Sequence, residues 1–140
     1  MSLSVLGDVN WLAVIVATVV YFAIGGLWYM FLFAKQWTRA MGTDPSESQQ
    51  GSPVQYALPL VTNLVSTIAL AMLAYASDTN TVAGGLVLGL VVGIGVAAAA
   101  IMATGFFDPQ KAAPITFAGI NAAYHVVGLA VAGMIIGAWA

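Results

Sequence analysis

Four long stretches of this chain contain no charged residue, and they constrain its fold more than any other feature. The three Lys/Arg and five Asp/Glu residues leave uncharged intervals at 9–34, 48–77, 79–107 and 112–140. Each interval can hold the ~20 apolar residues that cross a ~30 Å hydrocarbon core as a helix. Helices satisfy their own backbone groups, as the bilayer requires. The sequence therefore predicts an all-α integral membrane protein with four transmembrane helices.

The composition agrees with this fold class and excludes a water-soluble domain. Only 6% of the 140 residues are charged and 61% are hydrophobic, whereas a soluble domain is usually about a quarter charged. A cleaved signal peptide is not expected, because the first ten residues contain Asp8 and no Lys or Arg. The chain has no cysteine, which excludes disulfides and thiolate sites, and no basic cluster indicates binding to nucleic acid.

The charges and helix breakers also predict the organisation of the chain. We expect one four-helix transmembrane domain over residues 1–140, with a cytoplasmic loop at 34–53 and spans near 10–33, 54–77, 81–106 and 114–138. Every Lys and Arg lies in the first or third loop. The positive-inside rule then places these loops in the cytoplasm and both termini outside it, in the cell (inner) membrane.

Smaller features refine the prediction at the loops. Residues 34–41 are expected to form a short interfacial helix, and Asp44, Pro45 and Glu47 resemble the start of another helix. The tight turn around Asp78 should make the second and third spans antiparallel neighbours. Tryptophan and tyrosine favour the membrane interface, so we expect the aromatic residues at the span ends to lie there: Trp11, Tyr75 and Trp139 on one side, and Trp28, Tyr29 and Trp37 on the other.

The two halves of the chain share a faint similarity. Pro59 and Asn63 in the second span would correspond to Pro114 and Asn121 in the fourth. This correspondence is compatible with two parallel helix-hairpin repeats.

Glycines recur every fourth residue in the third span, at Gly85, Gly89 and Gly93, and a second pair, Gly133 and Gly137, lies in the last span. Within lipid, small residues stabilise helix pairs because they let the backbones approach closely. These five glycines are therefore predicted to lie at helix-packing surfaces. The contacts can be internal to the bundle, or they can form an interface between subunits, and the two can both hold.

Few polar side chains lie inside the spans. At 1.5 Å per residue, Tyr21, Asn63 and His125 come out near mid-membrane, while Tyr124 adjoins the histidine and Asn121 precedes it by one turn on the same helix face. Polar groups in hydrocarbon need partners, so this face should point into the bundle. The residues are either structural, with Asn121 and His125 donating to Asn63 or Tyr21, or they form a functional site.

Four short motifs are more specific than the apolar pattern around them. They are Asn10-Trp11-Leu12-Ala13-Val14, Gly25-Gly26-Leu27-Trp28-Tyr29, Lys35-Gln36-Trp37 and Ile120-Asn121-Ala122-Ala123-Tyr124-His125. Together they resemble a bacterial membrane-protein family, domain of unknown function 1761, over essentially the whole chain, although Ala34 stands where glycine would be expected. The resemblance implies a four-span membrane protein with a shared polar site, and it implies no activity.

The residues available for chemistry argue against an enzyme. The chain has one His and no carboxylate within a span, whereas zinc needs three or four protein ligands, so we expect no catalytic residue, no metal and no cofactor. The low charge, short loops and glycines favour a structural or accessory subunit that packs in the lipid bilayer as a homo-oligomer or with other membrane subunits. The alternative is a small-solute or proton transport or binding protein that uses the site around His125. A water-filled path to His125 would favour transport, and a sealed core would favour the structural role.

Overall fold

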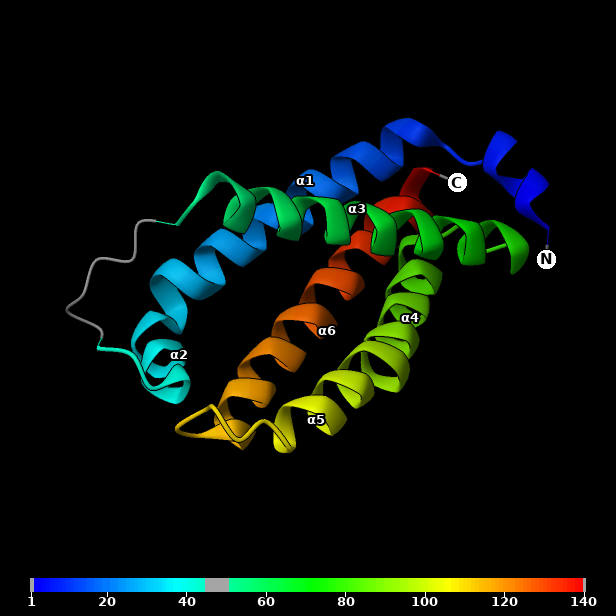
Figure 1. The fold of residues 1–140 in the computed structure, drawn as a ribbon. Coiled ribbons are helices and arrows are strands. Elements are labelled where there is room, and N and C mark those ends of the chain that lie inside the picture. Colours follow the sequence, from blue (N-terminus) through cyan, green and yellow to red (C-terminus); the bar gives the residue numbers. More distant parts are fainter. Residues whose placement is uncertain (1, 45–50, 140) are drawn as a thin grey trace.

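The computed structural model describes residues 2–44 and 51–139, which are predominantly helical (Figure 1). Four helices are long and apolar enough to cross a membrane: Trp11–Leu32, Pro53–Ala76, Val82–Phe106 and Pro114–Trp139. The predicted spans end within one residue of these bounds. The chain has the predicted all-helical fold of a multi-pass membrane protein.

The first span combines an α-helix with a π-helical end. A short 3-10 helix, η1 (Leu3–Gly7), precedes α1 (Trp11–Leu27), and α1 continues into the π-helical segment η2 (Trp28–Leu32). Asn10 starts α1, because its Oδ1 accepts a hydrogen bond from the backbone nitrogen of Ala13 at 3.2 Å. Such a cap satisfies one of the N–H groups that a helix leaves free in its first turn.

A short helix follows the first span. It is α2 (Ala34–Met41), which occupies the segment predicted to be an interfacial helix. Gly42 ends α2 with a φ of 88°, a left-handed conformation that glycine adopts without strain. The further helix start predicted from Asp44, Pro45 and Glu47 rests on residues outside the described part of the chain.

The second span is the single helix α3 (Pro53–Ala76). Proline is favoured in the first turn because the N–H that it lacks would have no partner there. Just before it, the backbone nitrogen of Ser52 donates to Oε1 of Gln55 at 2.9 Å. The helix ends at a tight turn in which Asp78 has a φ of 52°.

The third span is interrupted by a π-helical segment, whereas α6 (Pro114–Trp139) is continuous. The interrupted span consists of α4 (Val82–Val92), η3 (Gly93–Ala98) and α5 (Ala99–Phe106). The apolar pattern predicts unbroken helices and gives no sign of η2 or η3. Short π-helical turns inside α-helices are rare and frequently occur at functional sites.

α6 is the central helix of the bundle (Figure 1). It lies between α1 on one side and α4, η3 and α5 on the other, and α3 contacts both α1 and α6. Within the most apolar window of each span, 50% of the α6 residues are buried, against 28% in the first span and 11% in the third. The third span is therefore held chiefly by α6 and exposes most of its surface to lipid.

The two halves of the chain are less alike than their sequences suggest. Pro59 lies inside α3, whereas Pro114 is the first residue of α6, so the two prolines do not occupy equivalent positions. The turn at Asp78 does bring the start of α4 next to the end of α3, but α4 contacts α6 far more extensively than it contacts α3. The predicted helix-hairpin repeat gains no support from these positions and stays a prediction.

Candidate functional site

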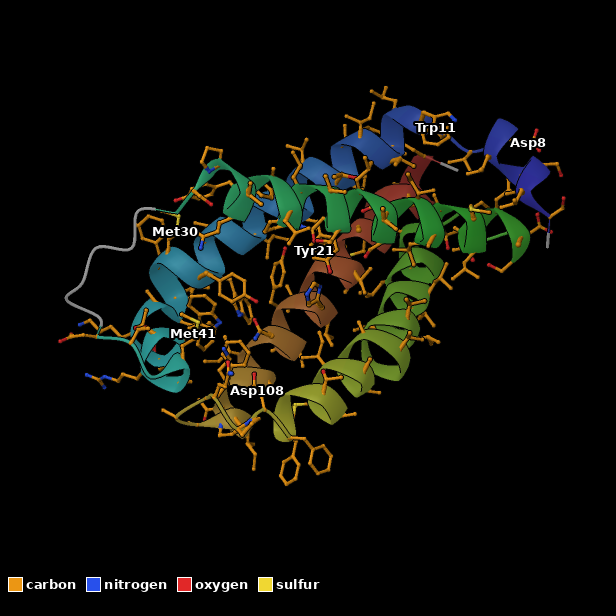
Figure 2. All side chains as sticks on the ribbon, viewed as in Figure 1. Asp8, Trp11, Tyr21, Met30, Met41 and Asp108 are labelled. Atoms are coloured by element: carbon orange, nitrogen blue, oxygen red, sulfur yellow. The ribbon has the colours of Figure 1, made fainter. Side chains whose placement is uncertain are left out.

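Six side chains from three spans form a polar cluster inside the bundle. They are Tyr21 and Tyr29 from the first span, Asn63 from α3, and Asn121, Tyr124 and His125 from α6. Figure 2 shows Tyr21 near the centre of the bundle, between Asp8 and Trp11 at one end and Met41 and Asp108 at the other. The cluster therefore lies at the depth that the helical rise predicts for its central members.

Tyr21 joins α1 to α6. Its hydroxyl shares a hydrogen bond with Nδ1 of His125, and the two rings meet edge to face with their centroids 5.9 Å apart. Tyr21 is fully buried, whereas His125 is only partly buried. Tyr21 is one of the two partners that depth in the membrane predicts for the histidine.

Asn63 joins α3 to α6 through Tyr124. The Nδ2 of Asn63 donates to the Tyr124 hydroxyl at 2.8 Å, and this hydroxyl lies 3.3 Å from the carbonyl oxygen of Tyr21, to which it donates. The predicted alternative, a bond from His125 to Asn63, is thus wrong. Successive residues of a helix point ~100° apart, so Tyr124 reaches Asn63 of α3 while the next residue, His125, reaches the Tyr21 hydroxyl instead.

Asn121 has a partner other than those predicted. Its Oδ1 accepts a hydrogen bond from the Tyr29 hydroxyl at 2.6 Å, and its Nδ2 donates to the carbonyl oxygen of Phe117 within α6 at 3.0 Å. The adjacent Trp28 donates from Nε1 to the carbonyl oxygen of Ile120 at 3.1 Å. The expectation that Asn121 donates to Asn63 or Tyr21 is wrong. Tyr29 lies about two turns after Tyr21, towards the end of α6 at which Asn121 lies, and its hydroxyl reaches Asn121.

Two glycines make room for the tyrosine rings of the cluster. A Cβ on Gly128 would overlap the ring of Tyr21, and a Cβ on Gly25 would lie 2.9 Å from the Tyr124 hydroxyl oxygen. On each helix the tyrosine precedes the glycine by four residues, as Tyr21-x3-Gly25 and Tyr124-x3-Gly128. α1 and α6 run antiparallel, so each helix places its ring over the glycine of the other. The Tyr21 and Tyr124 centroids are 5.4 Å apart.

The five glycines predicted to pack helices lie where the third span meets α6. A Cβ on Gly85 would overlap the carbonyl oxygen of Gly133, and a Cβ on Gly133 would overlap that of Gly85. Gly89 and Gly93 face the backbone of α6 in the same way, and Gly137 faces the carbonyl oxygen of Thr81. Because α6 covers Gly85, Gly89 and Gly93 within one chain, an interface between copies cannot use this ridge.

One cavity of the structure lies at the end of the bundle, and another lies on the exposed side of the third span. The first, of about 220 Å³, lies where α1, α3 and α6 meet at the end that carries both termini. The second, of about 420 Å³, is an open hollow on the third span beside Gly95. No member of the polar cluster lines either cavity.

A known family covers nearly the whole chain, including the polar cluster and the packing glycines. Its description is "Protein of unknown function (DUF1761)", and it matches residues 12–137. The chain belongs to the DUF1761 family. This confirms the resemblance drawn from the short motifs. Searches of curated proteins and of solved structures found no match.

In this DUF1761 chain a row of rings extends the polar cluster towards α2. The Tyr29 ring lies 5.3 Å from Tyr124 and 5.2 Å from Trp37, and Trp37 stacks on Phe117 at 6.1 Å. The Nε1 of Trp37 is buried without a hydrogen-bond partner in the described part of the chain. Lys111 completes the row with its Nζ 4.8 Å from the Phe117 centroid.

Sequence reasoning placed Trp28 and Tyr29 at the membrane interface and so missed that Tyr29 belongs to the polar cluster and that Trp28 bonds α6 beside it. Their spacing could have revealed them. They follow Tyr21 by seven and eight residues, and Gly25 follows it by four, which places all four on one face of a helix. The cluster offers hydroxyl, amide and imidazole groups and no carboxylate, so its chemistry is hydrogen bonding between helices.

Proposed function

We propose that this chain is a structural or accessory subunit of the membrane, not an enzyme, and that it packs as a homo-oligomer or within a larger membrane assembly. The observation that carries the proposal is the use of the mid-membrane polar groups. Tyr21, Tyr29 and Asn63 each hydrogen-bond a residue of α6, and neither cavity reaches them. A substrate site would instead present such groups to an open space.

The residue content supports the same proposal. Catalysis needs a nucleophile, an acid/base pair or a metal site, and His125 is the only histidine of a chain without cysteine. Its Nδ1 is already engaged by Tyr21. The proposed partners are therefore lipids and membrane helices, with no nucleic acid and no cofactor.

An oligomer would need a surface other than the glycine ridge, which α6 covers. The third span offers such a surface, because Val87, Val91 and Ile94 are all more than half exposed. In a bilayer, lipid chains or the helix of another subunit would cover these residues. A small membrane protein with short loops can associate with other subunits chiefly through such packing between helices within the bilayer.

The runner-up is binding or transport of a small polar solute or a proton at His125. One observation favours it: within the described residues the Nε2 of His125 has no hydrogen-bond partner, and the His125 side chain is only partly buried. A neutral imidazole with one free nitrogen can accept or donate a proton. Tyr21 and Asn63 are fully buried, which is why we prefer the structural role.

We further propose that both termini lie outside the cytoplasm. Lys35, Arg39 and Lys111 belong to the two loops at the opposite end of the bundle, which the backbone bond from Ala113 to the carbonyl of Ala40 holds together. Positive charge favours the cytoplasmic side. A reporter active only in the cytoplasm should give no signal when fused after Trp139 and a strong signal when inserted after Thr43. The reverse pattern would overturn this orientation.

Purification in native lipid, with identification of the proteins that co-purify, tests the main proposal. We expect a stable assembly larger than one chain, either with other membrane proteins or with further copies. His125→Gln should reduce thermal stability and the yield of the assembly together. A lone monomer, with a stable His125→Gln variant that has lost uptake or binding of a solute, would favour the runner-up and contradict the structural role.

A further inference from the structure

The cavity at the end of the bundle, here called the terminal pocket, has a small floor and a mixed mouth. Its floor includes the buried alanines Ala13, Ala71 and Ala74, one from α1 and two from α3. Their methyl groups leave a volume of about 220 Å³ between the helices. This is below the ~300–1,000 Å³ of pockets that take drug-sized ligands, so the terminal pocket suits a group of only a few heavy atoms.

The mouth of the terminal pocket carries one carboxylate and two aromatic rings. Asp8, Tyr75 and Trp139 line it from three separate segments, and the two rings are 50% and 46% exposed. Asp8 lies just before α1, Tyr75 near the end of α3 and Trp139 at the end of α6. At the end of a membrane span, aromatic side chains are expected to meet lipid headgroups. Figure 2 shows Asp8 and Trp11 at this end of the bundle.

Among the described residues, the carboxylate of Asp8 is the one charged group that lines this mouth, and it is exposed. Within residues 2–44 and 51–139 it makes no hydrogen bond through its side chain and no ion pair. The neighbouring Asn10 is different, because its Oδ1 caps α1 and its Nδ2 donates to the carbonyl oxygen of Trp139 at 2.9 Å. The Asn10 bond ties the end of α6 to the start of α1 and so holds Trp139 beside the terminal pocket.

We propose that the terminal pocket binds a small organic ammonium group. A carboxylate attracts the positive charge, and the faces of Trp and Tyr rings attract it further through their quadrupoles. An anion would be repelled by the negative charge of Asp8, the one charged residue among the described residues that line the pocket. The ammonium can come from the headgroup of an aminophospholipid in the surrounding leaflet or from a free amine in the water phase, since both present the same group to the mouth. The site is separate from the polar cluster and does not depend on the role proposed for it.

The first test titrates ethanolamine into the full chain in nanodiscs of phosphatidylglycerol, with calorimetry as the readout. We expect saturable binding of ethanolamine and none of propanol, in which a methyl group replaces the ammonium. Asp8→Asn should weaken binding by roughly fivefold, the value of a good exposed ion pair. Asp78→Asn is the matched control, since Asp78 lies in a turn at the same end and does not line the pocket, and asparagine tolerates its positive φ.

The second test distinguishes the two sources of the ammonium group. The protein is released from nanodiscs that mix phosphatidylethanolamine with phosphatidylglycerol, and native mass spectrometry counts the lipids retained. Selective retention of phosphatidylethanolamine, lost in Asp8→Asn and kept in Asp78→Asn, would assign the pocket to a headgroup, with or without binding of free ethanolamine. Binding of free ethanolamine alone would assign it to a soluble amine. If neither binds, if propanol binds equally well, or if Asp8→Asn binds like the wild type while its thermal stability is unchanged, the proposal is wrong.

Discussion

α6 meets its two neighbouring spans in different ways. Towards α1 the contact is made by side chains of both helices: Tyr21 lies over Gly128, Tyr124 lies over Gly25, and hydrogen bonds join the two helices. Towards the third span the contact is between backbones, because Gly85 and Gly133 face each other's carbonyl oxygens with no side chain between them. Glycine has a different role on each side of α6. Towards α1 it leaves space for a tyrosine ring, and towards the third span it lets the two backbones touch.

The difference shows how each pair of helices can be specified within lipid. Backbone contact between glycines gains van der Waals attraction over a long surface, but it has no directional group to choose a partner. The contact with α1 has directional groups in its hydrogen-bonded hydroxyls. They favour one partner and register, because a buried hydroxyl or amide that loses its partner costs ~1–3 kcal/mol. Within the described residues the third span is thus held to α6 by close packing alone, whereas α1 and α3 are held to α6 by packing and by hydrogen bonds.

The largest expected effect is a bulky side chain in the backbone contact. Gly85→Leu should destabilise the protein by about 3 kcal/mol or more, because the new atoms meet the backbone of α6, which cannot move aside locally. Gly95→Leu in the same span is the control, since a Cβ there has no neighbour within 4 Å. Unfolding in bicelles by a denaturing detergent measures both. Equal stability of the two variants would mean that the third span does not pack on α6 through Gly85.

A single methyl group on the other side of α6 should have a smaller effect. Gly128→Ala places its Cβ in the ring of Tyr21, which is buried and hydrogen-bonded and can yield only by shifting. We expect a loss of about 1–3 kcal/mol. Gly119→Ala in the same helix, where a Cβ has no neighbour within 4 Å, should be neutral or stabilise by up to ~1 kcal/mol. The same unfolding assay measures both variants, and a Gly128→Ala variant as stable as the wild type would show that the Tyr21 ring does not pack against Gly128.

The two tryptophans near η2 and α2 provide a smaller contrast. Trp28 donates from Nε1 to the Ile120 carbonyl of α6, whereas the Nε1 of Trp37 is buried without a partner in the described part of the chain. Trp28→Phe should cost ~1 kcal/mol for the lost bond, while Trp37→Phe should be close to neutral because it removes an unsatisfied donor along with part of a ring. The unfolding free energies of the two variants test this, and the opposite order would contradict the assigned bonds.

The spans could be predicted from the sequence because their limits are local. A charge, a proline or a capping residue marks these limits, as Asn10 and Pro53 do at the starts of α1 and α3. The packing face of the third span could be predicted in the same way, since its glycines repeat every four residues and glycine allows the closest approach of another backbone.

The partners inside the polar cluster could be predicted only in part. Depth along the helices gives Tyr21 for His125, but it does not say on which side of α6 each neighbour lies. For that reason depth alone predicts Asn63 as a further partner for His125, and it does not predict Tyr29 as the partner of Asn121. The π-helical segments η2 and η3 were not predictable either, because an extra residue in one turn leaves the hydrophobic composition unchanged.

The central claim is that the polar cluster stabilises the bundle by joining α1 to α6, and a double-mutant cycle on Tyr21 and His125 tests it most directly. Tyr21→Phe, His125→Leu and the double variant are unfolded in bicelles beside the wild type, and the coupling energy follows from the four free energies. The hydrogen bond between the two residues predicts a favourable coupling of about 0.6 kcal/mol, the average for such bonds between membrane helices, and at most ~1.7 kcal/mol. A coupling of zero, with His125→Leu as stable as the wild type, would show that the histidine does not hold α6 to α1.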